Sequence, residues 1–389
     1  MRAAEARAAA TAPSVRTSGT RTVLHVAQPT DGGVARYLAD LAASQLHAGW
    51  RVAVACPPPG PLSVELAAAG VDVLPWAASR APGAGLPAEV RALAALVASV
   101  DPAVVHLHSS KAGLAGRLAV RGGRVTVFQP HAWSVDAVPR GLRETAAAWE
   151  RVAAGWTDLL LCVAQQERHQ GEALGVRGRY AVVPNGVDTR RFSPADPLER
   201  AEARARLGLG PGPLAVCVGR VCRQKGQDLL LHAWRRIAST MPDATLALVG
   251  DGAGMPAARQ GVVFAGQVAD PRDWYAAADV VVCPSRWEGM ALVPLEAMAR
   301  ARSVVARDVG GTRESLPPGA GALVRADDPA ALAAALLPRL TDQAQADEEG
   351  RVGRSHVERH HELARTLAGV DRAYAFLLTG ARKAREVLG

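Results

Sequence analysis

Short apolar runs alternate along the chain with longer segments rich in alanine and leucine. The first half carries seven such runs, at residues 22–28, 51–56, 71–76, 104–109, 125–130, 159–164 and 181–185. Continuous apolar runs of this length predict strands that are buried on both faces, and the segments between them are long enough to form helices. The pattern therefore predicts an α/β domain whose parallel sheet is doubly wound, with helices on both sides.

The alternation stops and then starts again, which predicts a second domain of the same kind. Residues 186–213 combine a charged stretch with several prolines, so we expect a linker that contains one short helix. Further strands are expected at 214–220, 245–251, 262–266, 280–285 and 303–311, followed only by helices. We predict an N-terminal domain at 21–187, a C-terminal domain at 188–365, and a helix at 366–389 that crosses back to the first domain.

Length and composition agree with this organisation. At 389 residues the chain is about twice the size of an ordinary domain, and its 49% of hydrophobic residues is typical of a folded protein. Residues 1–20 are rich in alanine but interrupted by Arg7, Pro13 and Arg16, so we expect a disordered lead-in rather than a signal peptide. No apolar run reaches the roughly 18 residues that are needed to cross a bilayer.

Cysteine and histidine usage gives no sign of a disulfide or metal framework. The five cysteines include no Cys-x-x-Cys pair, and three of them lie inside apolar runs, which suits buried thiols in a reducing compartment. We therefore expect a cytoplasmic protein, with peripheral contact at the inner membrane face as a further option. His356, His360 and His361 lie close together, but the neighbouring Glu358 and Glu362 favour an exposed helix face over a metal site.

The net charge of +8 is compatible with a nucleic-acid, phosphate or membrane partner. Only 3 of the 45 basic residues are lysine, and the excess is spread along the chain, as in an arginine-rich composition. Residues 110–151 are the local exception, with a net charge of +4 from 7 basic and 3 acidic residues; they would contact an anionic membrane or form a solvated helix face. With only 4% aromatic residues, a nucleic-acid partner is not expected.

Two glycine-containing segments follow predicted strands. Asp31-Gly32-Gly33 would let an anion approach the backbone amides at a helix N-terminus. Gly219-Arg220, followed by Lys225-Gly226, places cations and amides where a diphosphate would bind, with a basic surface turn as the alternative. Neither these segments nor residues 250–254 match the Gly-x-Gly-x-x-Gly fingerprint. The sequence therefore does not favour an enzyme that binds a nicotinamide dinucleotide.

Two carboxylates eight residues apart form the strongest candidate site. Glu288 lies in the loop after a predicted strand, and Glu296 lies in the following helix. Glu288 would accept hydrogen bonds from sugar hydroxyls, and Glu296 would accept them from a ribose diol. A pair of acid and base carboxylates for hydrolysis is the competing interpretation. The cationic segment in the same domain favours an activated, diphosphate-bearing donor instead.

Taken together, these motifs resemble the retaining glycosyltransferases of family four, which have the GT-B fold of two facing Rossmann-like domains. The matches run in order from about residue 22 to 380. They are Gly32-Gly33 with Arg36, His106-Leu107-His108, Pro130-His131-Ala132-Trp133, Val183–Asp188, Gly219-Arg220 with Lys225-Gly226, Val249–Gly252, Glu288 with Glu296, and Gly310-Gly311 with Glu314. One departure is Ala291, which stands where many relatives have glycine.

The resemblance implies a nucleotide-diphosphate-sugar donor that is held mainly by the second domain, with no metal or other cofactor. Arg220 and Lys225 would bind the diphosphate and stabilise the leaving group, Glu288 would act at the sugar, and His131 would approach it from the first domain. The implied donor-binding residues are Gly32, Gly33, Gly219, Gly266, Val268, Gly289, Met290, Ala291, Leu292 and Glu296.

Several points stay open in the sequence. Front-face substitution and a double displacement with Glu288 as the nucleophile both fit a retaining enzyme. UDP is the expected donor nucleotide and a hexose the expected sugar, whereas the acceptor is a saccharide, a lipid-linked saccharide or a small-molecule hydroxyl. A sugar-nucleotide epimerase or hydrolase of the same fold, and a catalytically silent nucleotide-sugar-binding relative, are the alternatives.

Overall fold

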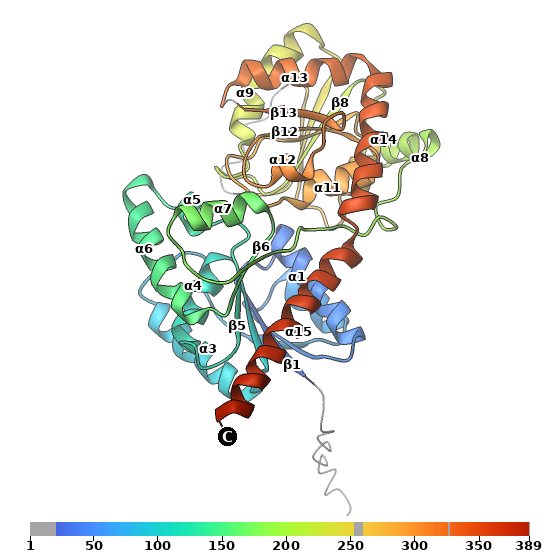
Figure 1. Cartoon of the computed structure of the whole chain (residues 1–389). Helices are drawn as coiled ribbons and strands as arrows, with labels where there is room; N and C mark the ends of the chain where they lie inside the picture. The colour runs from blue at the N-terminus through green and yellow to red at the C-terminus, as the bar shows by residue number, and fades with distance from the viewer. Residues whose placement is uncertain (1–20, 253–259, 326, 389) are drawn as a thin grey trace, which may run out of the picture.

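The computed structural model describes residues 21–252, 260–325 and 327–388, so the expected disordered lead-in at 1–20 lies outside the described residues. The first domain is built on a parallel sheet of seven strands in the order β3-β2-β1-β4-β5-β6-β7 (Figure 1). The strands are β1 (Thr22–Ala27), β2 (Arg51–Cys56), β3 (Asp72–Pro75), β4 (Val104–His108), β5 (Thr126–Gln129), β6 (Leu159–Cys162) and β7 (Tyr180–Val182).

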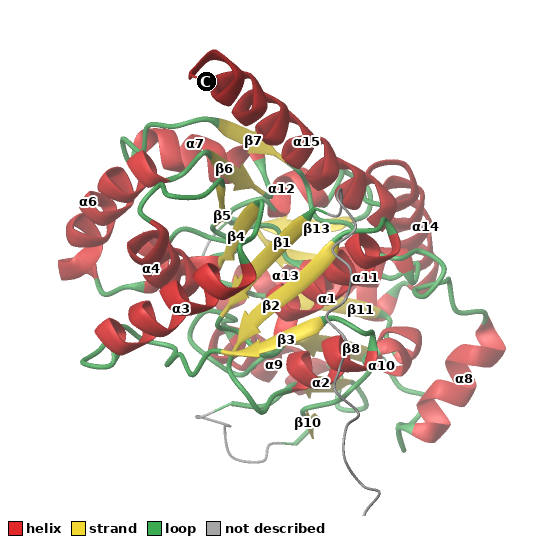
Figure 2. Cartoon of the chain, turned by 90° about the horizontal axis from the view of Figure 1, so that it is seen from below, coloured by secondary structure: helices red, strands yellow, loops and turns green. Residues whose placement is uncertain are grey.

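Helices cover both faces of this sheet. They are α1 (Gly32–His47), α2 (Pro61–Ala68), α3 (Leu86–Val100), α4 (Ser109–Val120), α5 (Ser134–Ala137), α6 (Arg143–Ala153) and α7 (Gln165–Ala173), with the 3₁₀ turns η1 (Arg140–Leu142) and η2 (Ala154–Trp156). Because successive strand residues point to opposite sides, Val23 packs with α1 and α2 while Leu24 packs with α3 and α4. Figure 2 shows α3 and α4 on one side of the strands.

The second domain has a parallel sheet of six strands in the order β10-β9-β8-β11-β12-β13. These strands are β8 (Leu214–Val218), β9 (Thr245–Val249), β10 (Val262–Gly266), β11 (Val280–Cys283), β12 (Ser303–Arg307) and β13 (Gly321–Val324). The helices are α8 (Pro197–Arg206), α9 (Gln227–Thr240), α10 (Arg272–Ala277), α11 (Leu292–Ala299), α12 (Thr312–Ser315), α13 (Pro329–Thr341), α14 (Gln343–His360) and α15 (Leu363–Leu388).

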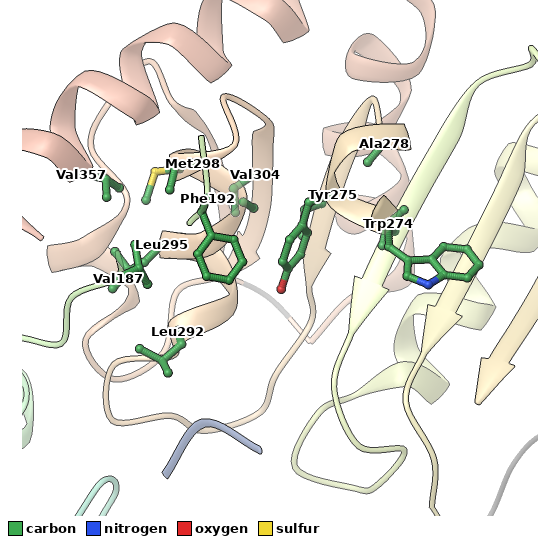
Figure 3. Close-up of a cluster of buried hydrophobic side chains, with 14 of the residues drawn as sticks. Val187, Phe192, Trp274, Tyr275, Ala278, Leu292, Leu295, Met298, Val304 and Val357 are labelled. Carbon is green, nitrogen blue, oxygen red and sulfur yellow. The ribbon is translucent and has the colours of Figure 1, made fainter. Parts of the chain in front are cut away.

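Two hydrophobic clusters hold this second sheet. One packs Trp234 of α9 and Leu336 of α13 against the strands. The other packs Tyr275 of α10 with Leu295 and Met298 of α11, and Figure 3 shows these side chains together. Strand β13 was not predicted, because its four residues begin with glycine and form no distinct apolar run. It becomes a strand by pairing with β12, from Val304↔Gly321 onward.

The last helix, α15, leaves the second domain and packs on the first, where Val370, Tyr374 and Leu377 join the hydrophobic cluster of the sheet. The two passages between the domains run side by side, since Val187 forms a parallel bridge with Glu362. His361 lies at this crossing, where its Nδ1 is 2.9 Å from the carbonyl oxygen of Asn185. The expectation of an exposed helix face is therefore wrong for His361, which is only 4% exposed.

Candidate active site

The loops that carry the predicted motifs follow the carboxyl ends of strands, and the two domains bring these loops together. Gly33, in the first turn of α1, faces Leu292 at the start of α11, because a Cβ added to Gly33 would lie 3.9 Å from the leucine Cδ1. Gly289 packs closely on the other domain, since a Cβ there would lie 2.9 Å from the carbonyl carbon of His131. Four predicted residues thus meet across the domain boundary, where open α/β sheets bind ligands.

An ion pair joins the loops after β8 and β11. Nζ of Lys225 lies 2.5 Å from Oε1 of Glu288, and the two side chains are 23% and 10% exposed. Burial disfavours the lysine charge, but the carboxylate outweighs it and raises the pKa of Lys225. A small pocket at this point is lined by Lys225, Ser285, Glu288 and Ala291, among other residues. The pair places one cation and one carboxylate together beside this small pocket.

Gly226 explains how the two loops approach each other. It caps α9 with a φ of 68°, in the left-handed region that favours glycine. A Cβ at this position would lie 2.2 Å from the carbonyl oxygen of Pro284. The Lys-Gly dipeptide is therefore needed so that Lys225 reaches the loop that carries Glu288.

Two arginines lie near each other from opposite domains. Arg220 follows β8, and Arg80 follows β3 in the first domain. Burial and then the charge of Arg220 lower the pKa of Arg80, while the nearby Asp31 raises it. Within the described residues, neither arginine takes part in an ion pair of the kind that joins Lys225 to Glu288. Two cations without a paired carboxylate make this part of the cleft suitable for an anion.

At the start of α11 the side chains are buried, so only backbone groups are available to a ligand. Met290 and Leu292 are 4% and 8% exposed and belong to a hydrophobic cluster that also contains Val163 from the end of β6. The side-chain amide of Asn185 donates a 2.7 Å hydrogen bond to the carbonyl of Met290 and fixes the loop. Predicted donor binding by Met290 and Leu292 would therefore use their backbone amides, of which that of Leu292 lies in the first turn of α11, where amides have no partner within the helix.

Glu296 lies deeper than the Glu288 pair. Its Oε2 accepts a 2.7 Å hydrogen bond from the hydroxyl of Tyr275, and the side chain is 8% exposed. Burial raises the pKa of Glu296, and the tyrosine hydrogen bond opposes the shift. Gly266 and Val268 lie elsewhere, at and beyond the end of β10, where Gly266 accepts a 2.8 Å hydrogen bond from the amide of Gly250. Glu296, Gly266 and Val268 do not line the small pocket at the Lys225–Glu288 pair, so their predicted ribose and base contacts remain predictions.

His131 lies on a strained stretch of backbone. The backbone angle φ is 54° at His131 and 110° at Ala132, values that residues other than glycine rarely adopt. Glu167, which sequence reasoning missed, compensates by accepting 2.7 Å hydrogen bonds from the amides of Ala132 and Val163. Burial lowers the pKa of His131 to about 3, so its imidazole is neutral near pH 7 and acts as a hydrogen-bonding group rather than a cation.

Known proteins share this architecture and sequence pattern. The Glycosyltransferase Family 4 pattern matches residues 31–191, and the Glycosyl transferases group 1 pattern matches residues 212–342. The lipopolysaccharide core biosynthesis mannosyltransferase LpsB of Rhizobium meliloti is 30% identical over 258 residues, which are 60% of this chain and 71% of that protein. This chain belongs to the family-four glycosyltransferases.

A second relative covers more of this glycosyltransferase. The GDP-mannose-dependent alpha-(1-6)-phosphatidylinositol monomannoside mannosyltransferase of Mycolicibacterium smegmatis is 33% identical over 298 residues, which are 70% of this chain and 75% of that protein. Sucrose-phosphate synthase from Thermosynechococcus elongatus superposes with a TM-score of 0.77 at 25% identity, over 92% of this chain and 100% of that one.

The HepE protein of Anabaena in complex with UDP-glucose superposes with a TM-score of 0.78 at 21% identity, over 91% of this chain and 99% of that one. The GT-B fold that the sequence predicted is confirmed by these likenesses and by the two parallel sheets.

The basic stretch 110–151 of the glycosyltransferase is only partly on the surface. Lys111 pairs with Glu89 at 2.5 Å and Arg117 pairs with Glu150 at 2.7 Å, and all four side chains are at most 7% exposed. The expectation that the whole stretch forms a basic surface is therefore wrong for Lys111 and Arg117. Arg121, Arg140 and Arg143 remain exposed. Within the part of the chain that the structure describes, no helix is both long and apolar enough to span a bilayer.

Some site residues of the glycosyltransferase left no clear signal in the sequence. Arg80 lies in a loop rich in alanine and glycine, and Glu167 lies within a polar helix without any motif. Glu314 was singled out only as part of the family pattern, yet it accepts hydrogen bonds from the amides of Gln165 and Gln166 in the other domain. These roles depend on contacts between distant parts of the chain, which no local pattern encodes.

Proposed function

We propose that this protein is a retaining hexosyltransferase that moves a sugar from a nucleoside-diphosphate sugar to a hydroxyl acceptor. The observation that carries the proposal is the Lys225–Glu288 ion pair at 2.5 Å, on loops that follow the carboxyl ends of β8 and β11. Arg220 and Arg80 supply further positive charge toward the same cleft. A diphosphate would bind these cations, while the first-turn amides of α11 and the Glu288 carboxylate bind the sugar.

The ion pair favours front-face substitution over a double displacement. A carboxylate that is held by an ammonium group at 2.5 Å is a weakened nucleophile, because attack would require loss of that contact. In the front-face route the bond from the anomeric carbon to the diphosphate oxygen breaks, and its electron pair passes to the diphosphate. The acceptor oxygen bonds to the same face of the sugar, and its proton passes to a diphosphate oxygen. Lys225 and Arg220 stabilise the developing charge.

GDP-mannose is the first donor to test, with UDP-hexoses second. Two of the relatives are named as GDP-mannose-dependent mannosyltransferases. Their names support GDP, rather than the UDP expected from the sequence, as the donor nucleotide. The test is a panel of labelled nucleotide sugars, incubated with the protein with and without cell extract and analysed by mass spectrometry. Transfer of the label to an extract component, with release of the nucleoside diphosphate, is the expected result.

The same panel separates the alternatives. Free monosaccharide or an epimerised nucleotide sugar in the absence of extract would replace the transferase proposal with a hydrolase or epimerase. Tight binding without turnover of any donor would instead indicate a silent relative. We expect Lys225→Met and Glu288→Gln each to reduce transfer at least about 100-fold, a size typical of lost charge stabilisation. Glu348→Gln, on the exposed face of α14, serves as the control and should leave transfer unchanged.

We further propose that peripheral membrane contact, if the acceptor is lipid-linked, involves η1 and the start of α6 rather than all of 110–151. Arg140 and Arg143 flank Leu142, whose side chain is 53% exposed, so cations and an apolar side chain share one surface. Sedimentation with vesicles that contain anionic lipid tests this surface. Binding that persists in Arg140→Ser/Leu142→Ser/Arg143→Ser would contradict it.

A further inference from the structure

Three histidines converge inside the first domain, below the candidate active site. His25 lies on β1, and His106 and His108 lie two residues apart on the neighbouring strand β4, so they point to the same side of the sheet. His25 and His106 are directly paired in the register of the two strands. All three side chains are fully buried, and one ring nitrogen from each lies within 4.8 Å of those of the other two.

The outer nitrogen of each ring is held by a different partner. Nε2 of His25 lies 2.7 Å from Oε1 of Gln45 in α1, and Nδ1 of His106 lies 2.7 Å from the hydroxyl of Tyr374 in α15. Nδ1 of His108 lies 3.3 Å from Nε2 of His131. Metal-binding histidines are typically oriented in this way, by a second contact at the nitrogen that does not bind the ion.

The remaining nitrogens face one another. Nδ1 of His25 and Nε2 of His108 are 3.0 Å apart, whereas Nε2 of His106 is buried without a hydrogen-bond partner among the described residues. An unpaired nitrogen at this depth is costly in a histidine cluster that serves only packing. Gln129 is a polar neighbour that opposes the lowering of the His106 pKa as a weak hydrogen-bond partner, although its buried amide oxygen has no partner at normal hydrogen-bond distance in the described part of the chain.

We propose that His25, His106 and His108 bind a divalent transition-metal ion, with Zn²⁺ as the first candidate. Three neutral imidazoles suit zinc, copper or nickel, and a fourth position would be taken by water. Zinc–nitrogen bonds of about 2.0–2.1 Å in a tetrahedron separate the nitrogens by about 3.3 Å. The observed 3.0 Å between His25 and His108 is close to that value, and a rotation of the His106 ring completes the set.

Burial keeps the three imidazole rings neutral. It lowers the pKa of His25 to about 4 and that of His106 and His108 well below the ordinary value, so the rings are neutral and able to bind an ion near pH 7. The three histidines do not line the pocket at the Lys225–Glu288 pair, although His108 contacts His131, and the metal content of the protein is measured without any transferase assay. A metal on Nε2 of His108 would leave a proton on Nδ1, so His108 would donate to His131.

Metal content of the intact protein tests the proposal. Protein freed of metal with a chelator is dialysed against Zn²⁺ or Co²⁺, freed of excess ion, and analysed by mass spectrometry for metal per chain. We expect about one ion per chain, and a Co²⁺ absorption spectrum typical of tetrahedral nitrogen coordination. X-ray absorption on the zinc form should show about three imidazole ligands.

Two variants distinguish this site from the histidines near the crossing of the domains. His106→Gln should weaken Zn²⁺ binding at least about 100-fold, because it removes a direct ligand. His356→Gln/His360→Gln, which removes the partly exposed pair at the end of α14, is the control and should leave binding unchanged. If His106→Gln fails to fold, the Co²⁺ spectrum and the X-ray absorption of the unmodified protein decide.

Either of two results would overturn the proposal. One is an unmodified protein that retains no ion above the level of a histidine-free control protein, which would leave a hydrogen-bonded cluster only. The other is a bound ion that is lost in His356→Gln/His360→Gln but kept in His106→Gln.

Discussion

Glu314 of α12 accepts a 2.8 Å hydrogen bond from the backbone amide of Gln165, the first residue of α7 in the other domain. A carboxylate at a helix N-terminus is favoured by the helix dipole and by amides that lack a partner within the helix. The contact therefore links the two domains at the edge of the cleft. We expect Glu314→Ala to loosen their relative orientation and to lower kcat/KM about 5- to 20-fold.

Small-angle scattering and steady-state kinetics together check this prediction. Glu172→Ala in α7 is the control, because among the residues that the structure describes Glu172 forms an ion pair only with Arg168 of the same helix. Unchanged kinetics and scattering in Glu314→Ala would show that the domains keep their orientation without this contact.

Gly289 packs closely against the first domain. A methyl group there would lie 2.9 Å from both the carbonyl carbon of His131 and Cγ2 of Val163, so Gly289→Ala should push the loop away from the first domain. We expect transfer to fall more than about 10-fold with little change in Tm. Gly155→Ala, where an added Cβ would have no atom within 4 Å, is the control. Activity in Gly289→Ala equal to that of Gly155→Ala would contradict the steric argument.

Arg80 contributes positive charge to the cleft from the first domain. If it helps to hold the donor diphosphate, Arg80→Met should raise KM for the donor about 5- to 10-fold while kcat changes less. The effect should shrink with added salt, because exposed charges are screened. Arg91→Met, on the exposed face of α3, is the control. Equal donor KM values for the two variants would exclude a role for Arg80 in donor binding.

Glu167 should give the protein a measurable pH dependence of stability. Burial raises the pKa of Glu167 to about 7 in the folded protein, against about 4.3 in an unfolded chain. Between these pH values the folded protein holds a proton that the unfolded chain has released, so stability from this group falls as pH rises. We expect the urea midpoint to fall less between pH 5 and pH 7.5 in Glu167→Gln than in the unmodified protein.

The glutamine also leaves one of the two backbone amides without an acceptor. Glu167→Gln should therefore be less stable by about 1–3 kcal/mol at pH 5. A parallel pH dependence in the two proteins would refute the titration of Glu167 in this range, even if the overall stabilities differ.

Arg117 and Glu150 form a fully buried ion pair rather than part of a surface patch. Arg117→Leu should destabilise the protein by about 3–5 kcal/mol, because it leaves a buried carboxylate unpaired. Arg117→Leu/Glu150→Leu should recover most of the loss, and the exposed Arg121→Ala should stay within about 0.5 kcal/mol. Urea unfolding measures all three. A loss below about 1 kcal/mol in Arg117→Leu would be inconsistent with complete burial.

The order of helices and strands was largely predictable because it depends on local pattern. Runs such as 214–220 and 280–285 are long, apolar and separated by helix-length segments, so they predicted β8 and β11 correctly apart from their last residues. Strand β13 escaped prediction because its four residues are defined by pairing with β12. The loops that carry Lys225 and Glu288 follow strands of one parallel sheet, so their position at the same edge was predictable, whereas their ion pair was not predicted.

The sequence by itself determined two parallel α/β domains and the motifs at their strand ends, since periodicity and chain adjacency are enough to specify both. The tertiary structure alone decided which charges are buried and which residues meet. Lys111 and Arg117 lie inside the first domain, Arg80 lies near Arg220, and His25 joins His106 and His108. Burial and pairing depend on contacts between segments that lie far apart in the chain, and those contacts exist only in the folded protein.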